Sequence, residues 1–295
     1  MAAVCTSGLG TGFIEQGNVV GGVMGAILGA TEALPVSADA HRHVVPALFG
    51  WAMPGPALIA AVQIAVALAI VVHLRRELVD LARGTIAAGA SGEVRGFEVR
   101  LVIGVVAAAV PVILFGGLLR RHFVPCTGSV AEGWTIGIAA IATAAVLLAA
   151  DLTARETRGW DDLRLRDAAV AAVVQLIALV PGVSAITALL IGALAMRLDR
   201  ASAVRFALLA ALPSLIVTGI GGLSAMRKLG IGAAGWQTTG VALGAAFVAA
   251  VAGVALLRLV TARLGAWPFV IHRLVVGGLL AMVAWLVGLD GAPTP

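Results

Sequence analysis

Several charged or ionisable side chains stand close together in an otherwise apolar, glycine-rich stretch near the start of the chain: Glu32, Asp39, His41, Arg42 and His43. A charged side chain in hydrocarbon costs roughly 2.5 to 3.5 kcal/mol at a helix centre, so it usually faces a cavity or a partner. This stretch is therefore the first candidate for a functional site.

A proline and a serine divide this stretch into two short helices. Pro35 lacks an N–H and disfavours helix at the residue before it, and Ser37 is a favourable first cap for a second helix. Ser37 and His41 are four residues apart, so they share one face of that helix. The N-terminus of a half-helix presents N–H groups and partial positive charge, which suit a phosphate.

A second apolar segment, residues 167–196, is interrupted in a similar way at Pro181 and Gly182. Its sequence Val-Pro-Gly-Val-Ser-Ala resembles Leu-Pro-Val-Ser-Ala at the first break, and Ser184 takes the place of Ser37. Paired interrupted segments are typical of repeats whose broken helices meet at a central site. The alternative is a coincidence of common residues.

The two broken segments each open one half of the chain and are each followed by three longer apolar segments. Three spans per repeat is an odd number, so we expect inverted repeats over residues 18–150 and 167–289 of a single membrane domain, 1–295. If the two breaks meet, Glu32, Ser37, His41 and the turn 181–187 share one pocket.

The composition is that of an integral membrane protein. Of 295 residues, 61% are hydrophobic and only 12% are charged, whereas soluble domains contain about 25% charged residues. The fold class is therefore all-α, with six transmembrane helices and two re-entrant helical hairpins. The six longer apolar segments are 56–74, 97–119, 134–150, 203–223, 240–259 and 269–289.

The distribution of basic residues predicts the orientation. Most Lys and Arg residues lie in the links 75–96, 151–167, 197–205 and 258–268, and few lie in the links on the opposite side. The positive-inside rule then places these four links in the cytoplasm and both termini outside, in the inner (plasma) membrane. The net charge of +5 is explained by these links, so no nucleic-acid partner is expected.

The N-terminal region and the cysteines offer no further site. The alternating Gly8, Gly10 and Gly12 are interpreted as a flexible end, because no strand precedes them as in a phosphate-binding loop. Cys5 and Cys126 indicate neither a disulfide framework nor a metal knuckle. No Lys or Arg precedes Arg42, so a cleavable signal peptide is not expected.

The sequences around both breaks resemble motifs of the undecaprenyl-pyrophosphate phosphatases of the bacitracin-resistance type. That family has a first motif like Glu-Gly-x-Thr-Glu-Phe-Leu-Pro-Ile-Ser-Ser-x-Gly-His and a second like Pro-Gly-x-Ser-Arg-Ser-Gly-x-Thr. The matching residues are Gly29, Thr31, Glu32, Leu34, Pro35, Ser37 and His41 in the first motif, and Gln175, Ala178, Pro181, Gly182 and Ser184 around the second. Further similarities extend along the chain, from Val62-Gln63 to Arg273 and Gly277.

Several family positions are replaced. In the first motif, the first glutamate falls on Leu28 and the second serine of the Ser-Ser pair falls on Ala38. In the second motif, the arginine falls on Ala185. The serine after it falls on Ile186 and the threonine on Leu189, with Thr187 nearby.

The resemblance implies attack on the terminal phosphorus of a polyprenyl diphosphate with help from a divalent cation, Mg²⁺ or Ca²⁺, a hydroxyl nucleophile and an arginine clamp. It assigns catalysis to Glu32 and His41, with Glu32 also binding the cation. The residues expected to contact the phosphates are Ser37, Arg42, Gly182, Ser184 and Thr187. Arg42 is not part of the family pattern, and we expect it to replace the missing arginine, because its planar fork suits bidentate phosphate contact.

Each of these residues also has a structural interpretation. Glu32 could accept from backbone N–H groups at the break, and Asp39 and Arg42, three residues apart, could neutralise each other. His43 could lie among outer headgroups, and Arg273 could reach the cytoplasmic surface.

Two functions follow from the sequence. The first is hydrolysis of undecaprenyl diphosphate to the monophosphate, which recycles the carrier lipid of cell-wall synthesis through a weakened or rearranged site. The alternative is a non-catalytic polyprenyl-phosphate binder or flippase, which the inverted repeats would suit. Homo-oligomerisation is left open, and an inert structural relic is disfavoured by the cost of the buried charges.

Overall fold

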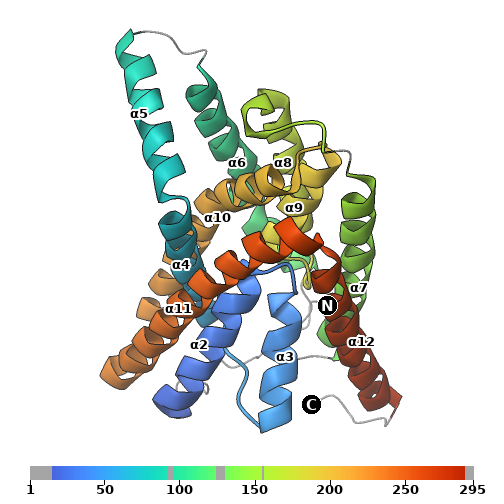
Figure 1. Ribbon diagram of the computed structural model, residues 1–295. Coiled ribbons are helices and arrows are strands. Elements are labelled where there is room, and N and C mark those ends of the chain that lie inside the picture. Colours follow the sequence, from blue (N-terminus) through green and yellow to red (C-terminus); the bar gives the residue numbers. More distant parts are fainter. Residues whose placement is uncertain (1–14, 92–95, 124–129, 155, 290–295) are drawn as a thin grey trace.

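The computed structural model describes residues 15–91, 96–123, 130–154 and 156–289, so Cys5, Cys126 and the glycines at 8, 10 and 12 lie outside the described residues. The described part of the chain is a bundle of α-helices (Figure 1). The helices are α2 (Gly17–Ala33), α3 (Ala38–Phe49), α4 (Pro56–His73), α5 (Arg75–Ser91), α6 (Phe97–Phe123), α7 (Val130–Thr153), α8 (Leu165–Ile177), α9 (Ala185–Ala195), α10 (Arg200–Lys228), α11 (Gly232–Leu264) and α12 (Trp267–Leu289), with a 3₁₀ turn, η1 (Trp160–Asp162), before α8.

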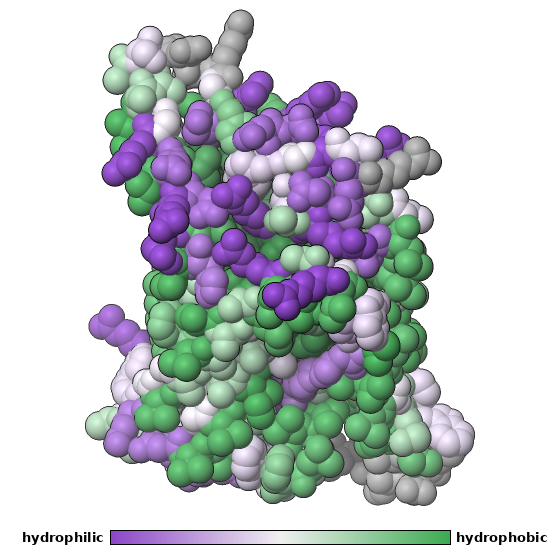
Figure 2. All heavy atoms as spheres, in the orientation of Figure 1, coloured by the Kyte–Doolittle hydropathy of each residue, from purple (hydrophilic) through white to green (hydrophobic). Residues whose placement is uncertain are grey.

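Six of these helices are long and apolar enough to cross a membrane: α4, α6, α7, α10, α11 and α12. This confirms an all-α membrane protein with six spans. Most of these helices extend beyond the apolar segments, as α11 does in running from Gly232 to Leu264 around residues 240–259. Helical hydrogen bonding continues into the polar ends, because it depends on the backbone and not on hydropathy. Figure 2 shows the apolar residues as a broad band below a hydrophilic end.

The link at 75–96 is largely helical, which the charge pattern alone did not predict. α5 begins directly after α4, and Leu78 N donates to Leu74 O across the junction at 2.8 Å. Leu74 and Leu81 are buried and Leu78 packs against the same core, so the apolar residues recur at helical spacing on one side. Figure 1 shows α5 rising beyond the spans beside α6.

A row of glycines fixes α2 to α11. A Cβ added at Gly25 would lie 2.1 Å from the backbone oxygen of Ala242, and one at Gly29 would lie 2.2 Å from that of Ala246. The two backbones therefore touch, which is the close approach that glycine at every fourth position permits. The first broken segment is in this way packed along a helix of the second half of the chain.

The four basic links meet on one side of the bundle. Asp151, at the end of α7, accepts hydrogen bonds from Nε of Arg200 at 2.9 Å and from the backbone N–H of Ala266 at 3.0 Å. Arg205 donates to Glu77 at 2.8 Å, which ties α10 to α5. These contacts join residues from all four links, and hydrophilic residues gather at the upper end in Figure 2.

Candidate functional site

The first break lies where Pro35 and Ser37 predicted it. α2 ends at Ala33, α3 begins at Ala38, and Val36 N donates to Leu34 O at 2.9 Å in the turn between them. Ser37 is the N-cap of α3 and adopts φ +64°, and its Oγ accepts from Ala40 N at 3.4 Å. The side chain of Ser37 thus satisfies the end of its own helix.

The second break is built in the same way around Gly182 and Ser184. α8 ends at Ile177 and α9 begins at Ala185. Ser184 caps α9 by accepting from Thr187 N at 3.2 Å, and its hydroxyl lies 2.7 Å from that of Thr187. Gly182 has φ +97°, and a Cβ there would lie 2.7 Å from the backbone oxygen of Ile136. Only glycine fits this position.

The two breaks meet at the centre of the bundle. Asp39, in the first turn of α3, accepts a hydrogen bond through Oδ2 from the N–H of Gly182 at 2.7 Å, across 143 positions of sequence. This contact supports the expectation that the two broken segments converge, and it comes from a side chain for which the sequence indicated only an ion pair with Arg42.

Arg273 of α12 holds the second break from its other side. Its guanidinium donates to Gly182 O at 2.8 Å, to Thr187 Oγ1 and Ala140 O at 3.3 Å each, and to Thr143 Oγ1. Arg273 is fully buried, so the interpretation that it reaches the cytoplasmic surface is wrong. Carbonyl and hydroxyl oxygens satisfy this guanidinium inside the bundle, which removes the need to reach water.

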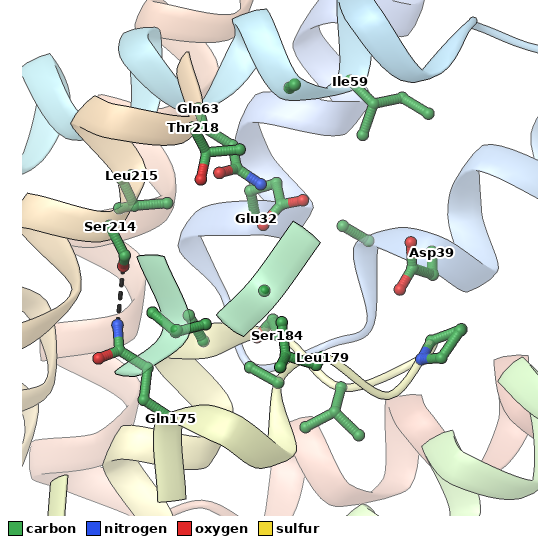
Figure 3. Close-up of a pocket in the computed structure, with 18 of the residues that line it drawn as sticks. Glu32, Asp39, Ile59, Gln63, Gln175, Leu179, Ser184, Ser214, Leu215 and Thr218 are labelled. Carbon is green, nitrogen blue, oxygen red and sulfur yellow. Dashed lines mark hydrogen bonds between the residues drawn. The ribbon is translucent and has the colours of Figure 1, made fainter. Parts of the chain in front are cut away.

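A cavity of about 500 Å³ lies beside the junction of the breaks. Figure 3 shows side chains entering it from several helices, with Asp39 on the α3 side and Gln175 and Ser214 on the far side. Apolar residues of α4, α6 and α10 form much of the wall. The polar and charged residues in its lining are Glu32, Asp39, Arg42, Gln63, Gln175, Ser184, Ser214 and Thr218.

The cavity contains some of the predicted site residues and not others. Glu32, Arg42 and Ser184 line it. The other four predicted residues are not part of the lining: Ser37, His41, Gly182 and Thr187. Of these, Ser37 and Thr187 are almost fully buried and take part in the helix caps. Ala38 and Ala185, which stand at the family's serine and arginine positions, also line the cavity. The methyl groups therefore lie where the missing functional groups would project.

His41 faces α12 and not the cavity. Its Nδ1 lies 2.8 Å from the backbone oxygen of Ser37, and its ring stacks on that of His272 with 5.1 Å between centroids. His41 follows Asp39 by two positions, about 200° around the helix, so the two side chains leave opposite faces. The Ser37 hydroxyl instead accepts from Ala40 N, and neither Ser37 nor His41 lines the cavity, so a ligand shared by these two side chains stays a prediction.

Asp39 and Arg42 form an ion pair, with 2.9 Å between Oδ1 and Nε. This is the mutual neutralisation that their spacing allowed. Both residues also line the cavity, and the Arg42 side chain is only 9% exposed. Among the described residues of the lining, Glu32 and Asp39 carry negative charge and Arg42 carries positive charge, so the lining is formally acidic.

Sequence reasoning assigned no role to the polar residues on the far wall. Gln175 Nε2 donates to Ser214 Oγ at 2.7 Å, and Ser214 donates to Ala211 O at 2.9 Å (Figure 3). Gln63 and Gln175 were recognised as family positions only, although an amide within an apolar segment is itself a signal. Ser214 and Thr218 are four apart on α10, and that spacing alone carried no such signal.

The described part of the lining contains oxygen donors but no complete metal site. The described residues contain no group of three or more His, Cys, Asp or Glu side chains placed to hold a metal ion. Glu32, Asp39 and Gln63 nevertheless present oxygen atoms to one cavity. Mg²⁺ in phosphoryl-transfer sites is usually held by one or two carboxylates, with phosphate oxygens and water completing its shell.

The fold and site together define a multi-pass helical membrane protein whose two broken helices border a cavity that holds acidic and basic side chains. The family described as "Bacitracin resistance protein BacA" matches residues 22–279, and the chain belongs to this family. It is 35% identical over 261 residues to "Undecaprenyl-diphosphatase 2" of Mesorhizobium japonicum, covering 88% of this chain and 97% of that protein. It is also 35% identical over 265 residues to an "Undecaprenyl-diphosphatase" of a Nocardioides species, covering 89% and 95%.

Proposed function

We propose that this protein binds a polyprenyl diphosphate, undecaprenyl diphosphate in the cell, and hydrolyses it to the monophosphate for reuse in cell-wall synthesis. The observation that carries the proposal is the convergence of Glu32, Arg42 and Ser184 from both broken segments on one cavity inside an apolar bundle. The names of the relatives support the substrate. A cavity within a membrane bundle suits such a lipid, because its tail can remain in the bilayer.

The residues of the lining suggest a division of roles. Arg42 is suited to contact the phosphate oxygens, and the Ser184 hydroxyl can donate to them. Glu32 is the carboxylate that can take the proton of an attacking water. His41 can take part only after its ring leaves His272, so we assign the proton transfer to Glu32. Gly182 and Thr187 then act by shaping the turn beside the cavity.

A divalent cation, Mg²⁺ or Ca²⁺, is part of this proposal. Glu32, with Asp39 or Gln63, would hold it together with the diphosphate oxygens. When bound, the cation supplies charge neutralisation to the phosphates in a lining that is itself acidic. Cation dependence of ligand binding is therefore expected.

We further propose that the two halves are inverted repeats and that the breaks form re-entrant hairpins. α2 packs on α11 and α8 packs on α6, and α3 contacts α12 as α9 contacts α7. In order along the chain, α2, α3, α6 and α7 of the first half correspond to α8, α9, α11 and α12 of the second half. Each of these contacts between the halves therefore has an equivalent when the two repeats are exchanged, which supports this arrangement. With the basic links in the cytoplasm, both termini lie outside the plasma membrane.

A second candidate is a non-catalytic binder or flippase of polyprenyl phosphate. The specific observation in its favour is that Ala38 and Ala185 line the cavity with methyl groups while His41 faces α12. Loss of a positioned arginine in phosphoryl transfer costs about 10³-fold or more where it has been measured. Binding would survive such losses better than catalysis.

Phosphate release from C55 diphosphate by the purified protein tests the proposal. Release that depends on Mg²⁺ or Ca²⁺ and falls about 100-fold or more in Glu32→Gln would support hydrolysis, because a general base contributes on that order. Lipid binding without release would support the second candidate. The absence of both would contradict the two candidates together.

A further inference from the structure

One carboxylate that lines the cavity binds an anion-binding group from each half of the chain. Oδ1 of Asp39 accepts from Nε of Arg42 at 2.9 Å, and Oδ2 accepts from the N–H of Gly182 at 2.7 Å. The Asp39 side chain is 28% exposed and lines the cavity. Asp39 is thus placed between the guanidinium of the first break and the turn of the second, within reach of a ligand.

The turn that Asp39 contacts is held in place by other residues. Gly182 packs against Ile136 with a positive φ, and its carbonyl accepts from Arg273 at 2.8 Å. The direction of the Gly182 N–H is therefore set by α7 and α12 as well as by Asp39. Removing the Asp39 carboxylate would leave this N–H pointing toward the same place.

Backbone N–H groups at turns and arginine forks are the groups with which proteins commonly bind phosphate. A carboxylate resembles part of a phosphate, since it offers two oxygen atoms and negative charge. In this chain the Asp39 carboxylate takes the position that a ligand phosphate would need in order to use Arg42 and Gly182 together. Ala185, which stands where the family has an arginine, itself adds no charge to the cavity.

We propose that Asp39 determines the specificity of this site as an internal anion, which a ligand phosphate must displace from Arg42 and Gly182. The inference rests on the proposed function, because it concerns the phosphate of the polyprenyl ligand. The resting site therefore binds free diphosphates weakly. It favours a diphosphate whose charge is already neutralised by a divalent cation.

The test is Asp39→Asn in the full-length protein, with farnesyl diphosphate as the probe. Asparagine keeps the size of the side chain and an oxygen that accepts from Gly182, but it removes the charge that competes with phosphate. We expect affinity in the absence of Mg²⁺ to rise at least about tenfold, which corresponds to one charge-assisted hydrogen bond made available to the ligand. The increase in affinity on adding Mg²⁺ should be smaller in Asp39→Asn than in the wild type.

Two controls separate charge competition from general effects. Asp80→Asn removes an exposed aspartate on α5 and should leave the affinity unchanged. Farnesol lacks phosphate and should bind the wild type and Asp39→Asn equally. In the double variant Asp39→Asn with Arg42→Ala, the gain in affinity for farnesyl diphosphate should largely disappear. The guanidinium with which Asp39 competes for the phosphate is then absent.

Folded Asp39→Asn protein with unchanged or weaker affinity for farnesyl diphosphate would overturn the inference, as would the absence of binding in both proteins. If Asp39→Asn does not fold, Asp39→Ser removes the same charge and should show the same gain. The readout is binding without turnover. A lack of phosphate release from C55 diphosphate would therefore contradict the proposed hydrolysis and leave this inference standing.

Discussion

At the scale of single residues, the second break depends on one buried guanidinium. Arg273→Met keeps much of the side-chain length but leaves Gly182 O and the hydroxyls of Thr143 and Thr187 without their donor. We expect the variant to lose about 3 kcal/mol or more of stability, because buried acceptors remain unsatisfied. Arg273→Lys should recover only part of the loss, since an ammonium lacks the planar fork.

The midpoint of thermal unfolding in detergent measures this loss. Arg263→Met, which changes an exposed arginine on α11, is the matched control and should shift the midpoint little. Equal midpoints for Arg273→Met and Arg263→Met would contradict the structural role of Arg273.

Ala185 is the residue at which the missing charge can be restored. It lies in the first turn of α9 and lines the cavity, so Ala185→Arg would bring a guanidinium to the phosphate-binding side. We expect phosphate release to rise at least about tenfold, a fraction of what a positioned arginine contributes elsewhere. Ala195→Arg, at the exposed end of the same helix, should not change the rate. Equal rates in both variants would contradict the proposed cavity as the reaction site.

Residues whose role is local were predicted well, and residues whose role is long-range were not. Ser37 and Ser184 cap their helices as expected, because capping depends on a few neighbouring positions. The contacts of Gly182 with Asp39 and Arg273 join distant parts of the chain, and no spacing encodes them. The face of α3 that meets the cavity was also undetermined, so the placement of His41 was missed.

At the scale of elements, the packing of α2 on α11 depends on glycine. Gly25→Ala would place a methyl group 2.1 Å from the backbone oxygen of Ala242, so the two helices would have to separate. We expect a loss of about 1 to 3 kcal/mol, the usual range for overpacking. Gly240→Ala in α11 is the matched control, because nothing lies within 4 Å of its added Cβ. Equal thermal midpoints for the two variants would contradict the close contact.

The existence and order of the six spans and of the two broken segments could be predicted from hydropathy. The helix α5 could not be predicted in this way. Apolar runs interrupted at Pro35 and Pro181 identified both breaks and the six spans. Residues 75–91 were interpreted as a link because five charged residues lie within their first nine positions. Their apolar residues recur at helical spacing over too short a distance to predict a helix from the sequence. Packing of these residues against the end of the bundle is nevertheless sufficient to stabilise the helix.

At the scale of the whole molecule, the joined basic links predict a single cytoplasmic face. In protein with Cys5 and Cys126 replaced by serine, Thr157→Cys should react with a membrane-impermeant maleimide only after the cells are opened. The basic link 197–205 contains the start of α10, and Lys228 lies at the other end of this helix. Lys228→Cys should therefore react in intact cells. Labelling of Thr157→Cys from outside would reverse the proposed orientation. Equal labelling of both sites in intact cells would contradict a span between them.

The contact between Arg273 and Gly182 has a consequence for biosynthesis. The two residues are 91 positions apart, so the ribosome completes both broken segments, α10 and α11 before it reaches the arginine that orients the second turn. The turn can acquire its final geometry only after α12 has been inserted beside α7. A nascent chain therefore carries an unfinished site through most of its insertion, and a chain stalled before α12 should be unable to hold lipid phosphate.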